Sequence, residues 1–355
     1  MRLDVTDNLD RESWNRLAAW AEGAHPCQSY EWGEFLAARK HKVFRIAVTH
    51  DGEPVATALI VRLRGEILGR CALSIPWGPV VRRYSADVLG ALKAAFLDVA
   101  RRESAALLRL GPAESDPCVE NLIVQCGFVP VRFPLRTAVQ YPYGMVLNLR
   151  RSDAELVGAV KPKWRYNIRL AERRGVEVTD SASPDHMEGL ALLAQQNANL
   201  VSAMHPSRLA DFWEYLSQAG DLRLFVAHRE GLPAAAALCL AYGAVCWLIA
   251  NPVSPDQRKH MANHLLHWRI INWARDHGYH TYHMGIGAPP AGPDHPMWGV
   301  SRFKAGFGAQ PVRYVGCFDM RLAPVLYRLC ARIPSAALKL AGRTRFDYDS
   351  SVTLT

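Results

Sequence analysis

The residues best suited to chemistry stand near the C-terminal end, in the stretch GVSRFKAGFGAQPVRYVG from Gly299 to Gly316. Lys304 follows Phe303 directly, and glycines come after it at positions 306 and 308. A lone cation in a glycine-rich turn has three interpretations: a surface charge, a phosphate clamp, or a group that stabilises charge developing in a reaction. The two glycines permit a tight turn and the close approach of a ligand to the backbone.

A second stretch, VGAVKPKWRYNIRLAERRGVEV, carries cations at helical spacing. On a helix that ends at Gly175, Trp164 and Ile168 fall on an apolar face. Beside that face, residues spaced by four form a basic stripe: Lys161, Arg165, Arg169 and Arg173. A solvated surface helix is the simpler interpretation. Only Glu172 compensates these cations nearby, so the stripe favours a phosphate-rich ligand.

The composition agrees with a polyanionic partner but does not identify one. The 355 residues include 42 basic and 33 acidic side chains, which gives a formal net charge of +9, and such a charge attracts polyanions. The eight cysteines are scattered without a CxxC pair, so we expect reduced thiols rather than disulfides. The first residues contain no apolar signal region, and no long uncharged apolar run follows. We therefore expect a cytoplasmic protein.

The elements that must position these residues occur twice along the chain. Residues 44–63 and 222–250 each predict strand, turn and strand, with the turns HDGEP and HREGLP. Each hairpin is followed by a helix and a strand, at 86–112 and 262–287, and then by the related turns CGFVPV and GFGAQPV. The fold class predicted is α/β, with two fused units in which mixed sheets are flanked by helices.

This repeated plan resembles the fold of the acetyl-CoA-dependent N-acetyltransferases. In that family a Q/R-x-x-G-x-G/A turn before the helix holds the pyrophosphate of coenzyme A on backbone amides. The chain has QRKHMA there, with His260 at the position of the first glycine. We therefore expect the acyltransferase fold without coenzyme A and assign no cofactor, and an acyl-CoA-dependent N-acyltransferase is kept as an alternative.

Four stretches, in order and at similar spacing, resemble the Fem family of aminoacyl-tRNA-dependent peptidyltransferases. They are SYEWGEF, KPKWRYNIRLAERRGVEV, INWARDHGYHTYHMGI and SRFKAGFGAQPVRYVGCFDMRLAPVLY. The resemblance covers nearly the whole chain, and its most specific element is the motif F-K-x-G-F-G. It implies a first acyltransferase-like domain on the acceptor side, residues 1–147 plus 318–355. A second domain, residues 148–317, would lie on the aminoacyl-tRNA side.

The family resemblance implies an enzyme that transfers an amino acid from its tRNA to an amine of a peptide acceptor. An aminoacyl ester is already activated, so attack by a neutral amine needs alignment and stabilisation of an oxyanion rather than a metal or a redox cofactor. Carried over residue by residue, the catalytic cation is Lys304. The contact for the tRNA end is Phe303, for which core packing is the alternative. A non-catalytic binding protein with the doubled fold is a further alternative.

Two further groups of residues are considered, the histidines and the acceptor-binding residues. No Ser-His-Asp arrangement and no HExxH motif is visible, so we assign no metal, and a general-base role for one of His260, His264 and His267 stays open but unassigned. The resemblance points to four acceptor-binding positions: Lys40, Arg208, Phe212 and Trp247. Phe212 stands where the family has a tyrosine, which leaves two acceptors open: a nucleotide-linked peptidoglycan precursor or a peptide natural product.

The basic segment near the C-terminal end has two interpretations. Arg328, Arg332 and Lys339 follow one another at near-helical spacing. We expect this segment to pack on the first domain, and peripheral contact with an anionic membrane is the alternative. No stable protein partner is implied by the sequence.

Overall fold

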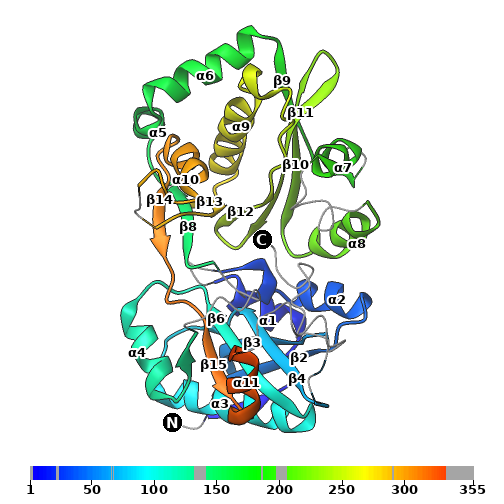
Figure 1. Ribbon diagram of the computed structural model, residues 1–355, viewed down its shortest axis with the longest axis vertical. Helices are drawn as coiled ribbons and strands as arrows, with labels where there is room; N and C mark the ends of the chain where they lie inside the picture. Colours follow the sequence, from blue (N-terminus) through cyan, green and yellow to red (C-terminus); the bar gives the residue numbers. More distant parts are fainter. Residues whose placement is uncertain are drawn as a thin grey trace. The chain divides into compact units, whose positions relative to one another are not determined.

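The computed structural model describes residues 3–20, 24–64, 66, 68–131, 141–184, 187–196, 206–289 and 292–332. The described chain forms two compact units (Figure 1). The first unit contains the described residues up to 142 and those from 314 onward, and the second contains those from 143 to 313. Each unit is built on its own β-sheet.

The sheet of the first unit begins with an antiparallel meander and continues with a parallel pair, β4 and β6. The strand β5 (Val80–Val81) pairs with β3 outside the main order. The main strand order is β1 (Leu3–Thr6), β2 (Val43–His50), β3 (Glu53–Arg62), β4 (Cys71–Trp77), β6 (Ala105–Pro112), β15 (Phe318–Arg321) and β7 (Val129–Pro130).

The sheet of the second unit repeats this order strand for strand, with β12 and β13 as its parallel pair. Its order is β9 (Val176–Ser181), β10 (Asp221–Arg229), β11 (Leu232–Tyr242), β12 (Val245–Ala250), β13 (Thr281–Ile286), β8 (Tyr143–Asn148) and β14 (Gln310–Arg313). The hairpins β2–β3 and β10–β11 turn at Asp51–Gly52 and Glu230–Gly231, all with positive φ, as tight hairpins with strongly twisted strands require. The predicted repeat and the α/β fold class are confirmed.

The helices follow the same repeat. In the first unit they are α1 (Arg11–Ala18), α2 (Tyr30–Ala38), α3 (Ala86–Arg102), α4 (Pro117–Gln125) and α11 (Pro324–Arg332). In the second they are α5 (Asp153–Ala159), α6 (Pro162–Arg173), α7 (Met187–Gln195), α8 (Pro206–Leu216), α9 (Ala262–Asp276) and α10 (Trp298–Ala305). By their places between strands, α3 corresponds to α9 and α4 to α10. Both α9 and α7 pack on β10 and β11, from opposite sides of these strands (Figure 1).

The chain passes between the units twice, and both passages are defined by strand pairing. The strand β8 follows the first unit along the chain but pairs with β13 and β14. The strand β15 follows the second unit but pairs with β6 and β7. Tyr143 and Arg313, at the two ends of the second unit, are directly paired across β8 and β14. The second unit is therefore a continuous segment, while the first is discontinuous in sequence.

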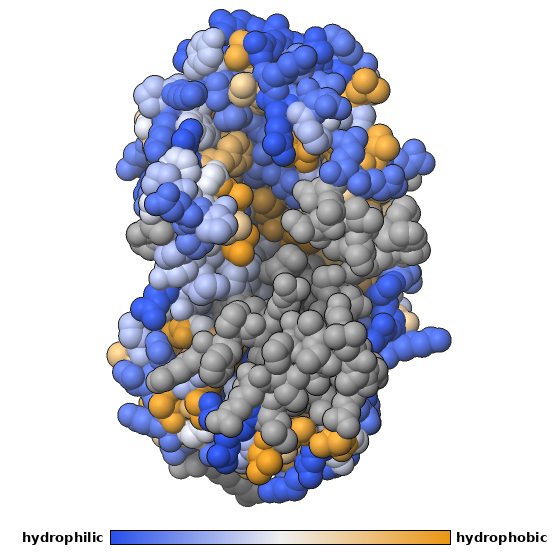
Figure 2. All heavy atoms as spheres, in the orientation of Figure 1, coloured by the Kyte–Doolittle hydropathy of each residue, from blue (hydrophilic) through white to orange (hydrophobic). Residues whose placement is uncertain are grey.

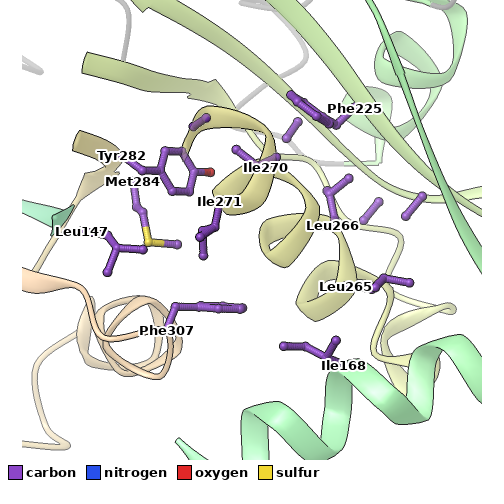
Figure 3. Packing of buried hydrophobic residues seen from close by; sticks show 14 of the residues in the cluster. Leu147, Ile168, Phe225, Leu265, Leu266, Ile270, Ile271, Tyr282, Met284 and Phe307 are labelled. Atoms are coloured by element: carbon purple, nitrogen blue, oxygen red, sulfur yellow. The ribbon is translucent and has the colours of Figure 1, made fainter. Parts of the chain in front are cut away.

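Each unit has its own apolar core. In the second unit, α9 contributes Leu265, Leu266 and Ile270, which recur at helical spacing on its buried face. Figure 3 shows Phe307 of the F-K-x-G-F-G motif in this core beside Ile271, so the second phenylalanine of the motif has a packing role. Gly175 ends α6 in a left-handed conformation, as expected, and Gly278 ends α9 in the same way. Among the helices described, none is both long and apolar enough to cross a membrane.

Candidate active site

The parallel strands β12 and β13 pair at their first residues and then separate. Beyond the last residue of β13 that pairs with β12, Gly285 has a φ of +78°, which residues with a side chain rarely adopt. The pairing of β13 with β8 is also interrupted there. Three residue pairs join the two strands: Val245 with Thr281, Cys246 with Tyr282 and Trp247 with His283. The carboxyl ends of the strands are therefore free to border a site.

Lys304 lies where these strands separate. The lysine is only 7% exposed, and its Nζ donates a hydrogen bond of 2.7 Å to the carbonyl oxygen of Ile286. A Cβ placed on Gly285 would lie 3.7 Å from Nζ and 3.9 Å from the carbonyl oxygen of Leu248. No carboxylate of the described residues forms an ion pair with this lysine. Burial lowers the pKa of Lys304 to about 7, so both forms are populated at neutral pH.

Phe303 borders the lysine but is partly buried. Its ring centroid lies 5.1 Å from that of His264, 5.3 Å from that of His267 and 5.4 Å from that of Phe307, each in an edge-on arrangement. It packs against the core and keeps part of its surface exposed. Phe303 could thus both pack in the core and contact a ligand, the two roles considered from the sequence. The assignment of Phe303 to the tRNA end stays a prediction.

The two glycines of the motif, Gly306 and Gly308, are required for different structural reasons. Gly308 has a φ of +92°, as a tight turn requires, but Gly306 has a helical φ of −65°. A Cβ on Gly306 would lie 2.1 Å from Cε2 of Trp164, because the indole covers this position. Trp164 Nε1 also donates a 3.0 Å hydrogen bond to the carbonyl of Phe303. Gly306 therefore serves close packing of α6 on α10, rather than the backbone freedom expected from the sequence.

The histidines near Lys304 are neutral at pH 7. Burial, with a contribution from Lys163, lowers the pKa of His264 to about 4. Burial and the charge of Lys304 lower the pKa of both His267 and His283 to about 3. Groups with such low pKa values are weak proton acceptors. In the described part of the chain, no three His, Cys, Asp or Glu side chains form a group that could hold a metal ion.

His267 instead belongs to a buried hydrogen-bond network. Its Nδ1 lies 3.0 Å from the hydroxyl of Tyr282, and its Nε2 lies 3.2 Å from Oδ1 of Asn251. Asn251 in turn donates to the backbone carbonyl of Ala236 and to the side chain of Asn263. This network ties α9 to β13 and to the segment after β12, and it holds the helix face that Phe303 packs against.

The basic stripe on α6 is largely exposed. Lys161, Arg169 and Arg173 are exposed, and the guanidinium of Arg173 lies 5.7 Å from the ring centre of Tyr166. Hydrophilic side chains predominate at the top of Figure 2, where Figure 1 places α6 of the second unit. Arg165 differs, because its Nη1 donates to the carbonyls of Val157 and Val160, at 3.1 and 2.7 Å. It therefore holds the C-terminal end of α5, a role that the sequence did not indicate.

The four predicted acceptor-binding residues are not all on exposed surface. Lys40 is exposed at the end of α2 in the first unit, in a left-handed conformation with φ of 63°. Phe212 and Trp247 belong to the second unit and are 6% and 3% exposed, and the Trp247 ring stacks on His283 at 4.0 Å. Arg208 is on α8, but its side chain lies outside the described residues. These acceptor assignments stay predictions.

The turn before α9 differs from a coenzyme A site in the way that the sequence suggested. His260 ends a short 3₁₀ helix, and the left-handed residue of the turn is Met261, with φ of 61°. No side chain caps α9. In place of a bare glycine backbone, the turn presents the side chains of His260 and Met261.

Comparisons with known proteins agree on the fold. The profile of the acetyltransferase (GNAT) domain matches residues 160–295, within the second unit. The lipid II:glycine glycyltransferase of Staphylococcus aureus is 21% identical, and the match covers 90% of this chain and 94% of that protein.

Two solved structures share the fold over nine-tenths or more of this chain. The crystal structure of FemX superposes with a TM-score of 0.82 at 19% identity, over 93% of this chain and 99% of that one. A tandem GNAT protein from the clavulanic acid biosynthesis pathway gives a TM-score of 0.56 at 17% identity, over 90% and 99% of the two chains. The chain therefore consists of two N-acetyltransferase-like units, as these proteins do.

Two features of the site had no clear signal in the sequence. The first is the carbonyl of Ile286, which accepts the hydrogen bond of Lys304. Ile286 follows a glycine in the segment HMGIG, and only that glycine indicated an unusual backbone there. Trp164 was assigned to an apolar face, but its contact with the F-K-x-G-F-G motif joins residues 139 positions apart. A single sequence contains no periodicity that reports such a contact.

Proposed function

Because this chain belongs to the Fem family, we propose that it transfers an amino acid from aminoacyl-tRNA to an amine of a peptide acceptor. The observation that carries the proposal is Lys304: a buried amine, bound to one carbonyl, at the separated ends of β12 and β13. Among the described residues this amine is hydrogen-bonded to a backbone carbonyl and to no carboxylate, and such a buried cation interacts strongly with negative charge that forms beside it.

The reaction forms one amide bond and breaks one ester bond. The neutral acceptor amine attacks the ester carbonyl, and the carbonyl oxygen becomes an oxyanion that the Lys304 ammonium stabilises. Collapse of this intermediate expels the ribose oxygen of the tRNA, which takes up a proton as the attacking nitrogen loses one. Since His264 and His267 are weak bases at pH 7, we assign neither of them this proton transfer.

The donor would lie on the second unit. The exposed cations of α6 suit a phosphate backbone, and Trp164 of the same helix contacts the motif that contains Lys304. The acceptor is a peptide, and the relatives named for lipid II favour a peptidoglycan precursor. A peptide natural product is the alternative acceptor.

The test uses the purified protein with a pool of radiolabelled aminoacyl-tRNAs and two acceptors, a nucleotide-linked muropeptide and a set of amino-terminal peptides. Label that survives mild base is in an amide, because the ester label is lost. We expect base-stable label on one acceptor and none without protein. Absence of base-stable label with every pair would contradict the proposal.

Acyl-CoA is included as a competing donor in the same assay. The side chains of His260 and Met261 at the turn before α9 predict negligible binding of acetyl-CoA. Calorimetry at micromolar protein checks this expectation, and a saturating isotherm would favour the N-acyltransferase alternative.

A further inference from the structure

A cavity of about 310 Å³ lies on the second unit, away from the strand ends that border Lys304. It is formed where α5 and α6 meet α9, three helices that lie together in Figure 1. Its volume is near the lower end of the range for small-ligand pockets. The lining residues are Val157, Val160, Arg165, Ile168, Arg169 and Trp268.

The lining combines an apolar floor with two cations. Val160 and Ile168 are buried, and Trp268 is partly buried against the core. Arg165 is fixed by its hydrogen bonds to the carbonyls of Val157 and Val160, while Arg169 is exposed, with its Nε 3.4 Å from the carbonyl of Arg165. Neither guanidinium pairs with a carboxylate of the described residues. The cavity therefore suits a flat apolar group joined to an anion.

The helix α6 contributes residues both to the cavity and to the packing of the Lys304 motif. Ile168 stands one turn after Trp164, about 6 Å along the helix axis, and Trp164 binds the carbonyl of Phe303. The exposed stripe residues Lys161, the N-cap of α6, and Arg173, its last residue, flank the cavity residues that α6 contributes. A strand of nucleic acid that follows the stripe would pass the cavity.

We propose that this cavity binds one nucleotide of the tRNA donor, with the base against Trp268 and Ile168 and its phosphate between Arg165 and Arg169. An indole and an aliphatic floor accept any base, since stacking on an aromatic ring is tolerant of sequence. The inference rests on the proposed function, because it names a second contact for the same donor. A lipid with an anionic head group is the other ligand of this general chemistry.

The test compares two donors. One is the full aminoacyl-tRNA, and the other is the same amino acid esterified to adenosine alone, which has no nucleotide to place in the cavity. The variants are Val157→Phe, which fills the cavity from a position that is 44% exposed, and Arg169→Ala. The controls are Val124→Phe and Arg102→Ala, at exposed positions on α4 and α3 of the first unit.

We expect each cavity variant to lower the ratio of kcat/KM for aminoacyl-tRNA to kcat/KM for aminoacyl-adenosine by about tenfold, the lower part of the range for loss of one base contact. The loss should fall mainly on KM for the tRNA, and the two controls should keep the wild-type ratio. An unchanged ratio in both variants would overturn the inference. So would an unchanged ratio together with weaker binding to vesicles of anionic phospholipid, which would assign the cavity to a lipid.

Failure of the proposed function gives a different result. In that case the wild-type protein transfers the amino acid from neither donor, whereas failure of the cavity proposal leaves wild-type transfer intact. Thermal unfolding of each variant is measured alongside, and a variant that is not folded is replaced by Val157→Met or Arg169→Gln before the ratio is interpreted.

Discussion

Arg109 in the first unit and Lys304 in the second are both buried cations near the parallel strands of their sheets, but their partners differ. Arg109 on β6 forms a two-pronged ion pair with Asp319 on β15, with distances of 2.7 and 2.8 Å, and Tyr327 donates to the same carboxylate. Lys304 has a backbone carbonyl as its partner.

The parallel strands near the two cations also differ, in the number of residue pairs that join them. The parallel pair β4 and β6 is joined by seven residue pairs, from Cys71 with Ala105 to Trp77 with Pro112. The pair β12 and β13 is joined by three. One fold thus occurs twice, closed around a neutralised cation in one unit and open beside an available cation in the other. The comparison teaches that two copies of one fold can differ in how far their parallel strands stay paired and in whether a buried cation has a carboxylate partner.

The largest expected effect comes from breaking the neutralised pair. Asp319→Ala leaves the Arg109 guanidinium buried without its carboxylate, which should cost about 3 to 5 kcal/mol of unfolding free energy. Urea denaturation measures this loss, and the double variant Arg109→Met with Asp319→Leu should recover most of it. If Asp319→Ala unfolds at the wild-type urea concentration, the pair does not hold β15 to β6.

Removing the available cation should instead affect the chemical step. Lys304→Met should lower the single-turnover transfer rate by two to three orders of magnitude, about 3 to 4 kcal/mol, with a much smaller change in aminoacyl-tRNA affinity. Gln125→Met is the matched control, because Gln125 precedes the related Gly127–Phe128 turn of the first unit by the same two positions. A folded Lys304→Met protein with near wild-type rate would rule out the role of this lysine.

The contact between α6 and the motif can be tested by adding one methyl group. Gly306→Ala places a Cβ 2.1 Å from the Trp164 indole, and such overpacking should cost about 1 to 3 kcal/mol of stability. Gly158→Ala on α5 is the control, since nothing lies within 4 Å of its added Cβ. Equal midpoints of unfolding for the two variants would show that Trp164 moves aside easily.

The pH dependence sharpens the assignment of charge. Since the pKa of Lys304 is about 7, the ammonium fraction should fall about tenfold for each pH unit above that value. The guanidinium of Lys304→Arg stays protonated over this range. The ratio of the wild-type rate to the Lys304→Arg rate should therefore fall as pH rises from 7 to 9. The acceptor amine titrates equally in both proteins, so it cancels, and a flat ratio would indicate that the cationic form is not required.

The smallest expected effect concerns the exposed stripe. Arg173→Ala should weaken binding of tRNA a few-fold and reduce the slope of log affinity against log salt by about one, as expected for one lost phosphate contact. Arg102→Ala on α3 is the control in the first unit. Arg165 is less suitable for this measurement, because its loss would also disturb α5. An unchanged salt slope in Arg173→Ala would remove this residue from the tRNA surface.

The sequence predicted the repeat because hairpin turns and helix stops are local signals. Gly52 and Gly231 in the predicted hairpin turns and Gly175 at the predicted helix end all have positive φ. The motif singled out Lys304, which is buried, and its assignment as the catalytic cation stays a prediction.

Long-range features could not be predicted in the same way. The early separation of β12 and β13 depends on pairing between segments more than 30 positions apart, and their composition does not differ in kind from that of β4 and β6. The backbone role of Arg165 was hidden because a helical stripe reports which residues share a face, but not which of them turn back to a carbonyl. Phe212 and Trp247 were chosen by position in a motif, which contains no information on burial.

The direct pairing of Tyr143 with Arg313 bears on the order in which the protein matures on the ribosome. The chain enters and leaves the second unit at neighbouring backbone positions. All strands of this unit are therefore available once residue 313 has been synthesised. The first unit, although translated earlier, lacks β15, the strand between β6 and β7, until Arg321 has been synthesised. Its partly formed sheet must keep an open edge at β6 while about two hundred residues are added, and nascent chains with such edges are prone to misassembly. The N-terminal unit is thus the last to complete its fold.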